Sequence, residues 1–325
     1  MVLVLFVVKI EIVSLAFVKV NLVNKVKMYI CENFKVMQFL IYILLYPILW
    51  FISILPFRLL YALSDAIYGI VYYLIGYRKS TVRENLALAL PHLSAKERLQ
   101  IEKKSYQHMC DMFLEMIKTM SISKAEMEKR FQFKNLEVYL DLEKKQKSVA
   151  LLCAHYASYE WVISMNHRIT FDGFAIYKKI NNTYFDTLVK KIRSKFGATL
   201  ITTKETIPVI RTNTKENRLG IYGFASDQSP KIYSVFHWNK FMGVEVPVHT
   251  GAEMLAKKYD MNVVFLKVKK LKRGYYEASF ENVFENVKDY PNYEITDQFL
   301  KLVEAQISEA PEYYLWTHKR WKHRR

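Results

Sequence analysis

Glycine, proline and cysteine are scarce in this sequence of 325 residues. With 9 glycines and 8 prolines, no flexible linker divides the chain into obvious domains. The three cysteines, Cys31, Cys110 and Cys153, are far apart and form no CxxC pair, which argues against a disulfide scaffold or a zinc site and favours a reducing compartment. The sequence also lacks a glycine-rich phosphate loop, a GxSxG elbow and a DxD-type cluster, so we expect neither a metal nor a cofactor.

Acidic residues are outnumbered by basic ones. The chain has 48 Lys and Arg against 31 Asp and Glu, a formal net charge of +17. Such an excess implies a negatively charged partner, which could be nucleic acid, an anionic membrane surface or an acidic protein. The 23 Tyr and 20 Phe argue against disorder, and the length suffices for one large domain or two small ones.

Charged residues are absent from Val36–Leu55. This apolar stretch has about the 20 residues needed to cross the hydrocarbon core of a bilayer, and Lys35 and Arg58 flank it where they can reach headgroups. We therefore expect a membrane-anchor helix over residues 36–58. The alternatives are a cleaved signal peptide, although no small-residue cleavage site follows, and an apolar helix of a soluble core.

A second apolar stretch, Leu59–Tyr77, carries Asp65. We expect it to lie at the membrane interface or to pack on a catalytic domain that spans residues 59–325. Residues 1–35 form an N-terminal extension to which we assign no function, because charges interrupt its apolar residues. Met28 and Met37 are alternative starts to Met1.

Short apolar runs alternate with helical stretches from Val149 onward. Expected strands are Val149–Cys153, Phe174–Tyr177, Thr199–Ile201, Leu219–Phe224, Val263–Val268 and Tyr275–Phe280. Expected helices are Ser94–Ser121 with a capping box of Ser94 and Glu97, Ser158–Arg168, Tyr184–Phe196, Thr206–Asn213, Gly251–Tyr259 and Thr296–Ala310. The alternation predicts an α/β fold, a mixed sheet layered by helices, preceded by the anchor helix. In such sheets ligands bind at the carboxyl ends of strands.

One expected strand end carries a histidine. The apolar run Val149–Ala154 stops at His155, and Glu160 follows five positions later. If Ser158 caps a helix, Glu160 sits in its first turn and can meet His155 across the loop. His155 would then remove a proton from a hydroxyl, while Glu160 orients the ring and stabilises the imidazolium. The alternative is a buried histidine that is satisfied by a backbone carbonyl.

The segment HYASYEW, which begins at His155, resembles the His-x-x-x-x-Asp/Glu motif of the glycerolipid acyltransferases. The closest resemblance is to the HtrB/LpxL branch, the late acyltransferases of lipid A biosynthesis. In that branch the motif commonly reads His-Tyr-Gly-Asn-Trp-Glu, so Ala157 and Ser158 depart from it. Further blocks resemble the branch in the same order between Phe39 and Lys322: Tyr77–Leu86, Ile176–Gly197 with Lys179 in place of the usual proline, Ala225–Pro230, Phe241–Gly243 with Pro247, and Tyr314–Lys322.

The resemblance also implies further site residues. Arg193 lies in a basic helix that could simply be a solvated face, but the resemblance implies that it faces the active site, where it could stabilise an oxyanion or hold a phosphate. Lys178, at the preceding strand end, could serve the same anionic substrate. Asp227 and Gln228 follow an expected strand, where they either cap the loop or line the site.

The resemblance implies acyl transfer from an acyl carrier protein thioester to a hydroxyl of a phosphorylated lipid A precursor, with no metal or cofactor. The site would lie on the cytoplasmic face of a bacterial inner membrane, and the positive chain would steer the acidic donor protein. We expect the basic and aromatic tail Trp316–Arg325 to bind headgroups of the membrane surface rather than nucleic acid. The alternatives are another acceptor (a lysophospholipid, an aminolipid or a pigment-like hydroxyl) and a non-enzymatic basic membrane-associated or nucleic-acid-binding protein.

Overall fold

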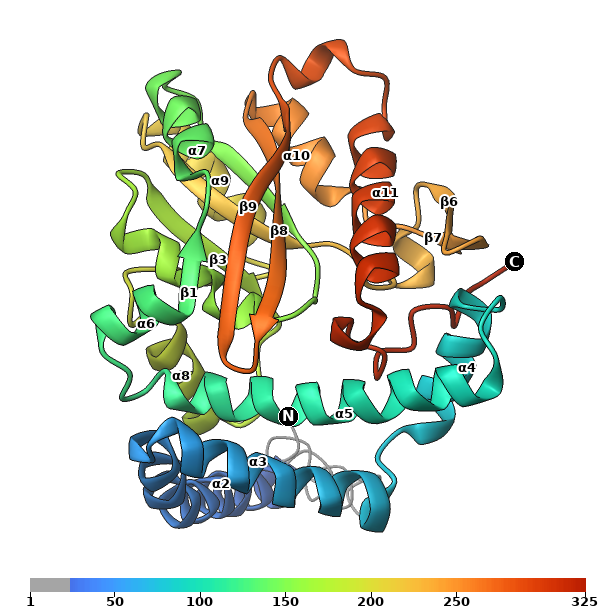
Figure 1. The fold of residues 1–325 in the computed structure, drawn as a ribbon. Helices are drawn as coiled ribbons and strands as arrows, with labels where there is room; N and C mark the ends of the chain where they lie inside the picture. Colours follow the sequence, from blue (N-terminus) through green and yellow to red (C-terminus); the bar gives the residue numbers. More distant parts are fainter. Residues whose placement is uncertain (1–23) are drawn as a thin grey trace.

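A computed structural model of the chain describes residues 24–325, with side chains from residue 36 onward (Figure 1). The expected N-terminal extension, residues 1–35, lies outside the described residues as far as position 23. Its remainder belongs to the first described helix, α2, which runs Asn24–Ile54. The predicted charge-free stretch forms the second half of this helix, so the anchor segment is helical up to Ile54.

The second apolar stretch is also helical. It forms α3 (Phe57–Gly69), which continues into the π-helix η1 (Ile70–Ile75). Pro56 separates α2 from α3 at the position before the first helical turn, where its missing N–H removes no helical hydrogen bond. By length and composition, Val36–Ile54 and Phe57–Ile75 could each cross a membrane, with mean hydropathies of 2.0 and 1.2. Only 22% of each segment is buried.

A seven-stranded sheet forms the centre of the fold, in the order β1-β9-β8-β2-β5-β3-β4. Its strands are β1 (Phe131–Phe133), β2 (Val149–Cys153), β3 (Asp172–Tyr177), β4 (Thr199–Thr202), β5 (Gly220–Ala225), β8 (Asn262–Lys272) and β9 (Tyr275–Phe284). Five neighbours from β8 to β4 are parallel, and β9 and β1 run the opposite way. The predicted mixed α/β sheet is confirmed, and each of the six expected strands is present.

The helices that pack around the sheet largely match the prediction. They are α4 (Lys79–Ala89), α5 (Ala95–Lys118), α6 (Lys124–Arg130), α7 (Leu136–Lys144), α8 (Thr183–Arg193), α9 (Thr206–Lys215), α10 (Gly251–Tyr259) and α11 (Glu294–Glu309). The capping box of α5 is confirmed, because Glu97 N donates to Ser94 Oγ (3.3 Å) and Ser94 N donates to Glu97 Oε2 (2.7 Å). The stretch after His155 is a 3₁₀-helix, η2 (Tyr159–His167), rather than an α-helix.

Helix α5 lies between the sheet and the N-terminal helices. In Figure 1 the carboxyl end of β8 points down toward α5, and α2 and α3 lie on the other side of α5. Because β2 and β5 run parallel to β8, their carboxyl ends face the same way. The edge of the sheet where ligands are expected therefore faces α5.

The C-terminal tail is part of the core. Trp316, Arg320 and Trp321 are each 1% exposed, and the two indole rings stack with centroids 6.0 Å apart. Trp321 also stacks on Phe241, which lies in β6 (Trp238–Phe241) of a hairpin with β7 (Val244–Pro247). The prediction that the aromatic residues of this tail bind headgroups is wrong, because packing in the core buries them.

Candidate active site

Strand register brings His155 and Asp227 together. In the parallel pair of β2 and β5, Cys153 lies opposite Ala225, and each polar residue follows two positions later. Asp227 Oδ1 accepts hydrogen bonds from the backbone N of His155 (3.0 Å) and from its Nδ1 (2.7 Å). Since the carboxylate can only accept from Nδ1–H, the network assigns the proton of the neutral ring to Nδ1. Nε2 is then free to accept a proton.

The expected pairing of His155 with Glu160 is wrong. Glu160 instead accepts two hydrogen bonds from Arg193, from Nε to Oε2 (2.7 Å) and from Nη2 to Oε1 (2.5 Å). The cause is local, because Trp161 inserts into the core and donates from Nε1 to Thr119 Oγ1 (3.0 Å). This anchors η2, and Glu160 meets the end of α8 rather than the imidazole.

Burial and charge act in opposite directions on the histidine and aspartate pair. Burial disfavours the imidazolium, but the Asp227 carboxylate and its hydrogen bond outweigh burial and raise the pKa of His155. Burial would raise the pKa of the Asp227 carboxyl, but His155 outweighs it and the pKa is lowered. Asp227 is therefore an ionised, 1% exposed carboxylate, and it stabilises the protonated form of a ring whose side chain is 20% exposed.

Arg193 and Glu160 form a second charged pair near this ring. Burial would lower the pKa of the Arg193 guanidinium, but Glu160 raises it, so the arginine stays charged. The charge of Glu160 also contributes to the raised pKa of His155. The charge of Arg193 acts on the pKa of His155 and lowers it, while two of its nitrogens are committed to Glu160; a role in binding substrate stays a prediction.

A narrow pocket opens beside His155 and is walled by α5. Its lining residues are Ser105, His108, Met109, Met112, His155, Ala157, Tyr159, Tyr313, Tyr314, Leu315, Trp316 and Thr317. The Tyr159 ring packs edge-on against the imidazole with centroids 5.0 Å apart. A base at the end of a buried strand thus adjoins a small, mostly apolar cavity of about 10 Å³, which has room for about one water molecule.

The other predicted site residues are spread along the same sheet edge. Lys178 follows β3, the strand next to β5, and is exposed. Gln228 follows Asp227, is half-buried, and makes no side-chain hydrogen bond with the described residues. Among the residues that the structure describes, no group of three or more His, Cys, Asp or Glu could hold a metal ion.

Sequence reasoning missed two features of the site. Tyr159 and His108 both line the pocket, but only the register of β2 and the position of α5 reveal this. Ala157 has φ +48°, in the left-handed region that favours glycine. This explains why the resembled motif commonly has glycine there, and it shows that alanine adopts the same turn.

Comparisons with known proteins identify the family of this chain. Residues 31–323 match the family described as "Bacterial lipid A biosynthesis acyltransferase". The chain is 22% identical over 278 residues to a protein named "Lipid A biosynthesis lauroyltransferase" from Escherichia coli (strain K12), and the match covers 85% of this chain and 90% of that relative. The matched range contains His155, Asp227, Glu160 and Arg193. The chain belongs to the bacterial lipid A biosynthesis acyltransferase family and is an acyltransferase.

Proposed function

We propose that this protein transfers a fatty acyl chain from an acyl thioester to a hydroxyl of a lipid A precursor, with His155 as the general base. The observation that carries the proposal is the hydrogen bond from His155 Nδ1 to the buried Asp227, because it leaves Nε2 as the acceptor beside the pocket. The family and the lauroyltransferase relative support the substrate class.

The reaction needs a proton acceptor and a site for developing negative charge. His155 Nε2 takes the proton of the acceptor hydroxyl as its oxygen attacks the thioester carbonyl carbon. The tetrahedral intermediate then collapses, the C–S bond breaks, and the leaving thiolate takes the proton from the imidazolium. The products are an ester and a free thiol. Asp227 stabilises the imidazolium throughout and needs no protonation itself.

Glu160, Arg193, Lys178 and Gln228 complete the proposed site. Glu160 adds negative charge near the imidazolium and holds the Arg193 guanidinium in place. Arg193 and the exposed Lys178 are the cations that would hold a phosphate of the acceptor. Gln228, which follows Asp227 in the chain, would contact the acceptor lipid.

The donor that we propose is acyl carrier protein. It is acidic, and the net charge of +17 on this chain favours its approach. No metal or cofactor takes part in this scheme.

The second substrate is proposed to arrive from the membrane. The outward faces of α2, α3 and η1 expose large apolar side chains, which include Leu40 (60%), Leu44 (70%), Phe51 (59%), Leu59 (56%) and Leu74 (80%). Apolar exposure on this scale is typical of a membrane-interaction surface. The proposed arrangement is an anchor over residues 36–58 and an acyltransferase domain over 59–325, on the cytoplasmic face of a bacterial inner membrane.

Lipid mass spectrometry of the host envelope tests the proposal. Cells with the wild-type protein, with His155→Ala and with a deletion are compared. Loss of one acyl chain from lipid A in both altered strains is the expected result. Loss of an acyl chain from a different lipid class would identify that lipid as the acceptor in place of lipid A. Unchanged lipids in both altered strains would overturn the catalytic role of His155.

A further inference from the structure

The pocket beside His155 contains a second histidine that the proposed reaction does not yet use. His108 lies on α5, is 5% exposed, and lines the same cavity as His155. Its Nε2 is buried and has no hydrogen-bond partner of ordinary geometry among the described residues. An unsatisfied buried polar group costs about 1–3 kcal/mol, so a ligand atom with better geometry than the Ala157 carbonyl would stabilise this nitrogen.

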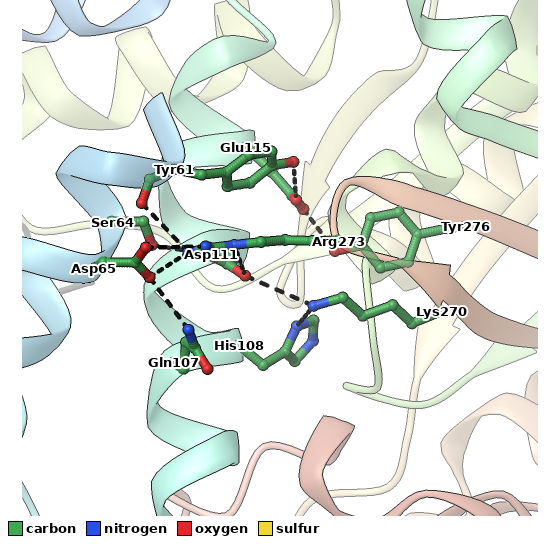
Figure 2. Close-up of polar contacts among 10 residues, drawn as sticks. All are labelled: Tyr61, Ser64, Asp65, Gln107, His108, Asp111, Glu115, Lys270, Arg273 and Tyr276. Carbon is green, nitrogen blue, oxygen red and sulfur yellow. Dashed lines mark hydrogen bonds and ion pairs between the residues drawn. The ribbon is translucent and has the colours of Figure 1, made fainter. Parts of the chain in front are cut away.

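The surroundings of His108 fix which nitrogen carries the proton. Lys270 Nζ lies 3.2 Å from Nδ1 of His108 (Figure 2). An ammonium group can only donate, so Nδ1 accepts and the proton of the neutral ring is on Nε2. Lys270 is itself held by Asp111, whose Oδ2 is 3.7 Å from Nζ. Asp111 is fixed in turn by Arg273 and by Ser64. These contacts hold Lys270 beside Nδ1, so the orientation of the His108 ring is fixed and Nε2 is its donor.

The same surroundings keep the ring neutral. Burial and the positive charge of Lys270 hold the pKa of His108 well below its usual range, against the weaker opposing effect of the Ala157 carbonyl. The two histidines of the cavity thus have opposite electrostatic environments, since a carboxylate contacts one and an ammonium the other. His155 is suited to accept a proton, and His108 is suited to donate a hydrogen bond without changing its charge.

We propose that His108 Nε2–H donates a hydrogen bond to the thioester carbonyl oxygen as this oxygen gains negative charge in the tetrahedral intermediate. The inference rests on the proposed acyl transfer. A neutral imidazole is an effective electrophile when a nearby positive charge or dipole lowers its pKa, and Lys270 supplies that polarisation here.

Two further observations favour His108 for this position. Arg193, the obvious alternative donor, commits Nε and Nη2 to Glu160. The cavity is narrow, but Met109 and Met112 on its wall have flexible side chains that can make room for a thioester. The base would then approach from the sheet edge and the donor from α5, on two elements that enclose the reacting carbon.

Steady-state kinetics of the purified full-length protein with acyl carrier protein thioester and lipid A precursor test the inference. His108→Leu removes the donor and should lower kcat by about 10²–10³-fold, the usual effect of losing one oxyanion donor, with KM changed less than threefold. His108→Gln, whose amide nitrogen can reach a similar position, should recover at least tenfold of that loss. Lys103→Ala, an exposed residue of α5 outside the network of Figure 2, is the matched control. A His108→Leu variant that keeps kcat within threefold of wild type would overturn the inference and leave the role of His155 intact.

A spectroscopic measurement separates donation from a purely structural role. Nitrogen NMR of histidine-labelled protein, with His108→Gln for assignment, should show His108 protonated on Nε2 and neutral at pH 6. Lys270→Met removes the donor to Nδ1, so the His108 proton should no longer be confined to Nε2 and kcat should fall. His155→Ala should abolish turnover altogether. A ring protonated on Nδ1, or an imidazolium at pH 6, would contradict the inference. Wild-type protein that transfers no acyl chain would refute the proposed function and this inference with it.

Discussion

Replacement of Asp227 by asparagine tests the core of the site with a magnitude that the structure supplies. Oδ1 of Asp227 accepts from both the backbone N and the Nδ1 of His155, whereas its Oδ2 makes no hydrogen bond of ordinary geometry within the part of the chain that the structure describes. An asparagine would therefore keep its carbonyl oxygen toward His155, because the backbone N–H can only donate. The amide nitrogen would occupy the place of Oδ2, and the ring would retain its proton on Nδ1.

What Asp227→Asn removes is charge rather than geometry. A hydrogen bond to a charged group contributes about 1.5–3 kcal/mol and a neutral one about 0.5–1.5 kcal/mol. The loss of about 1–2 kcal/mol of imidazolium stabilisation predicts that kcat falls about 5–30-fold. Asp227→Ala loses the orientation of the ring as well and leaves two donors unsatisfied, so we expect a fall of about 10²–10³-fold.

The pH profile of kcat/KM supplies the second readout. Activity requires neutral His155, so the rate rises with pH through the pKa of this ring. Asp227 raises that pKa against the effect of burial, and in Asp227→Asn the charge of Glu160 is the raising influence that remains, against burial and Arg193. The acid limb should move to lower pH. An asparagine variant as impaired as the alanine variant, or an acid limb that stays in place, would refute the proposed orientation of residue 227.

Substitutions at three further positions test packing and burial through thermal and chemical unfolding. Burial and the charge of Asp111 raise the pKa of Glu115 from 4.5 to about 7, so the stability of the protein should fall as pH rises from about 4.5 to about 7. At about 1.36 kcal/mol per pKa unit, Glu115→Gln should remove about 3 kcal/mol of this pH dependence. An unchanged pH profile of the melting temperature in the variant would contradict the prediction. Gly274 has φ +74°, and an added Cβ would lie 2.0 Å from Tyr61 Oη. Gly274→Ala should therefore lower the stability by about 2–4 kcal/mol, and by less in a Tyr61→Phe background, which lacks this oxygen. Equal losses of stability in both backgrounds would disprove the clash. Ala157→Gly should change the stability by less than about 1 kcal/mol, because relief of the left-handed backbone strain offsets the larger entropy that glycine loses on folding. Ala157→Val should cost more than about 2 kcal/mol. A valine variant as stable as the wild type would exclude the strained turn.

Six of the nine described strands could be predicted from local apolar runs in the sequence. β2 is buried along most of its length, and a continuous apolar sequence of five residues is typical of a central parallel strand. The short strands β1, β6 and β7 were missed because three or four residues with polar members show no such run. Their pairing depends on contacts with distant segments.

The candidate site was only partly predictable for a similar reason. His155 could be found from its place after an apolar run, but its partner Asp227 lies 72 positions away. Only the neighbouring positions of β2 and β5 in the sheet bring the two together. Glu160 was assigned to His155 from a spacing that assumed an α-helix, and the 3₁₀-helix that forms turns it toward Arg193. Spacing along the chain predicts a side-chain contact only when the local backbone is the assumed one.

Helix α5 contacts the apolar helix α3 on one side and lines the pocket beside His155 on the other, and the spacing of its polar residues shows how. His108, Asp111 and Glu115 recur at intervals of three and four, so they share one face. On this face, Asp111 accepts from Ser64 of α3 (2.8 Å) and from Arg273 of the β8–β9 turn, while Glu115 accepts from Tyr61 of α3 (2.8 Å) and Tyr276 of β9 (2.9 Å) (Figure 2).

Those contacts join α3 to the sheet through α5, and Arg273 also donates directly to Asp65 of α3. Breaking one partner of such a buried polar network is costly because the remaining charge is left unpaired. The apolar helices therefore cannot shift without disturbing Asp111, which positions Lys270 beside His108. Since a helix is about 10 Å across, a lipid held at the outer face of α3 lies roughly two helix diameters, about 20 Å, from the pocket that contains both histidines, because α3 and α5 both stand between them (Figure 1). The fold thus couples the position of the proposed membrane layer directly to the geometry of the proposed acyl-transfer site.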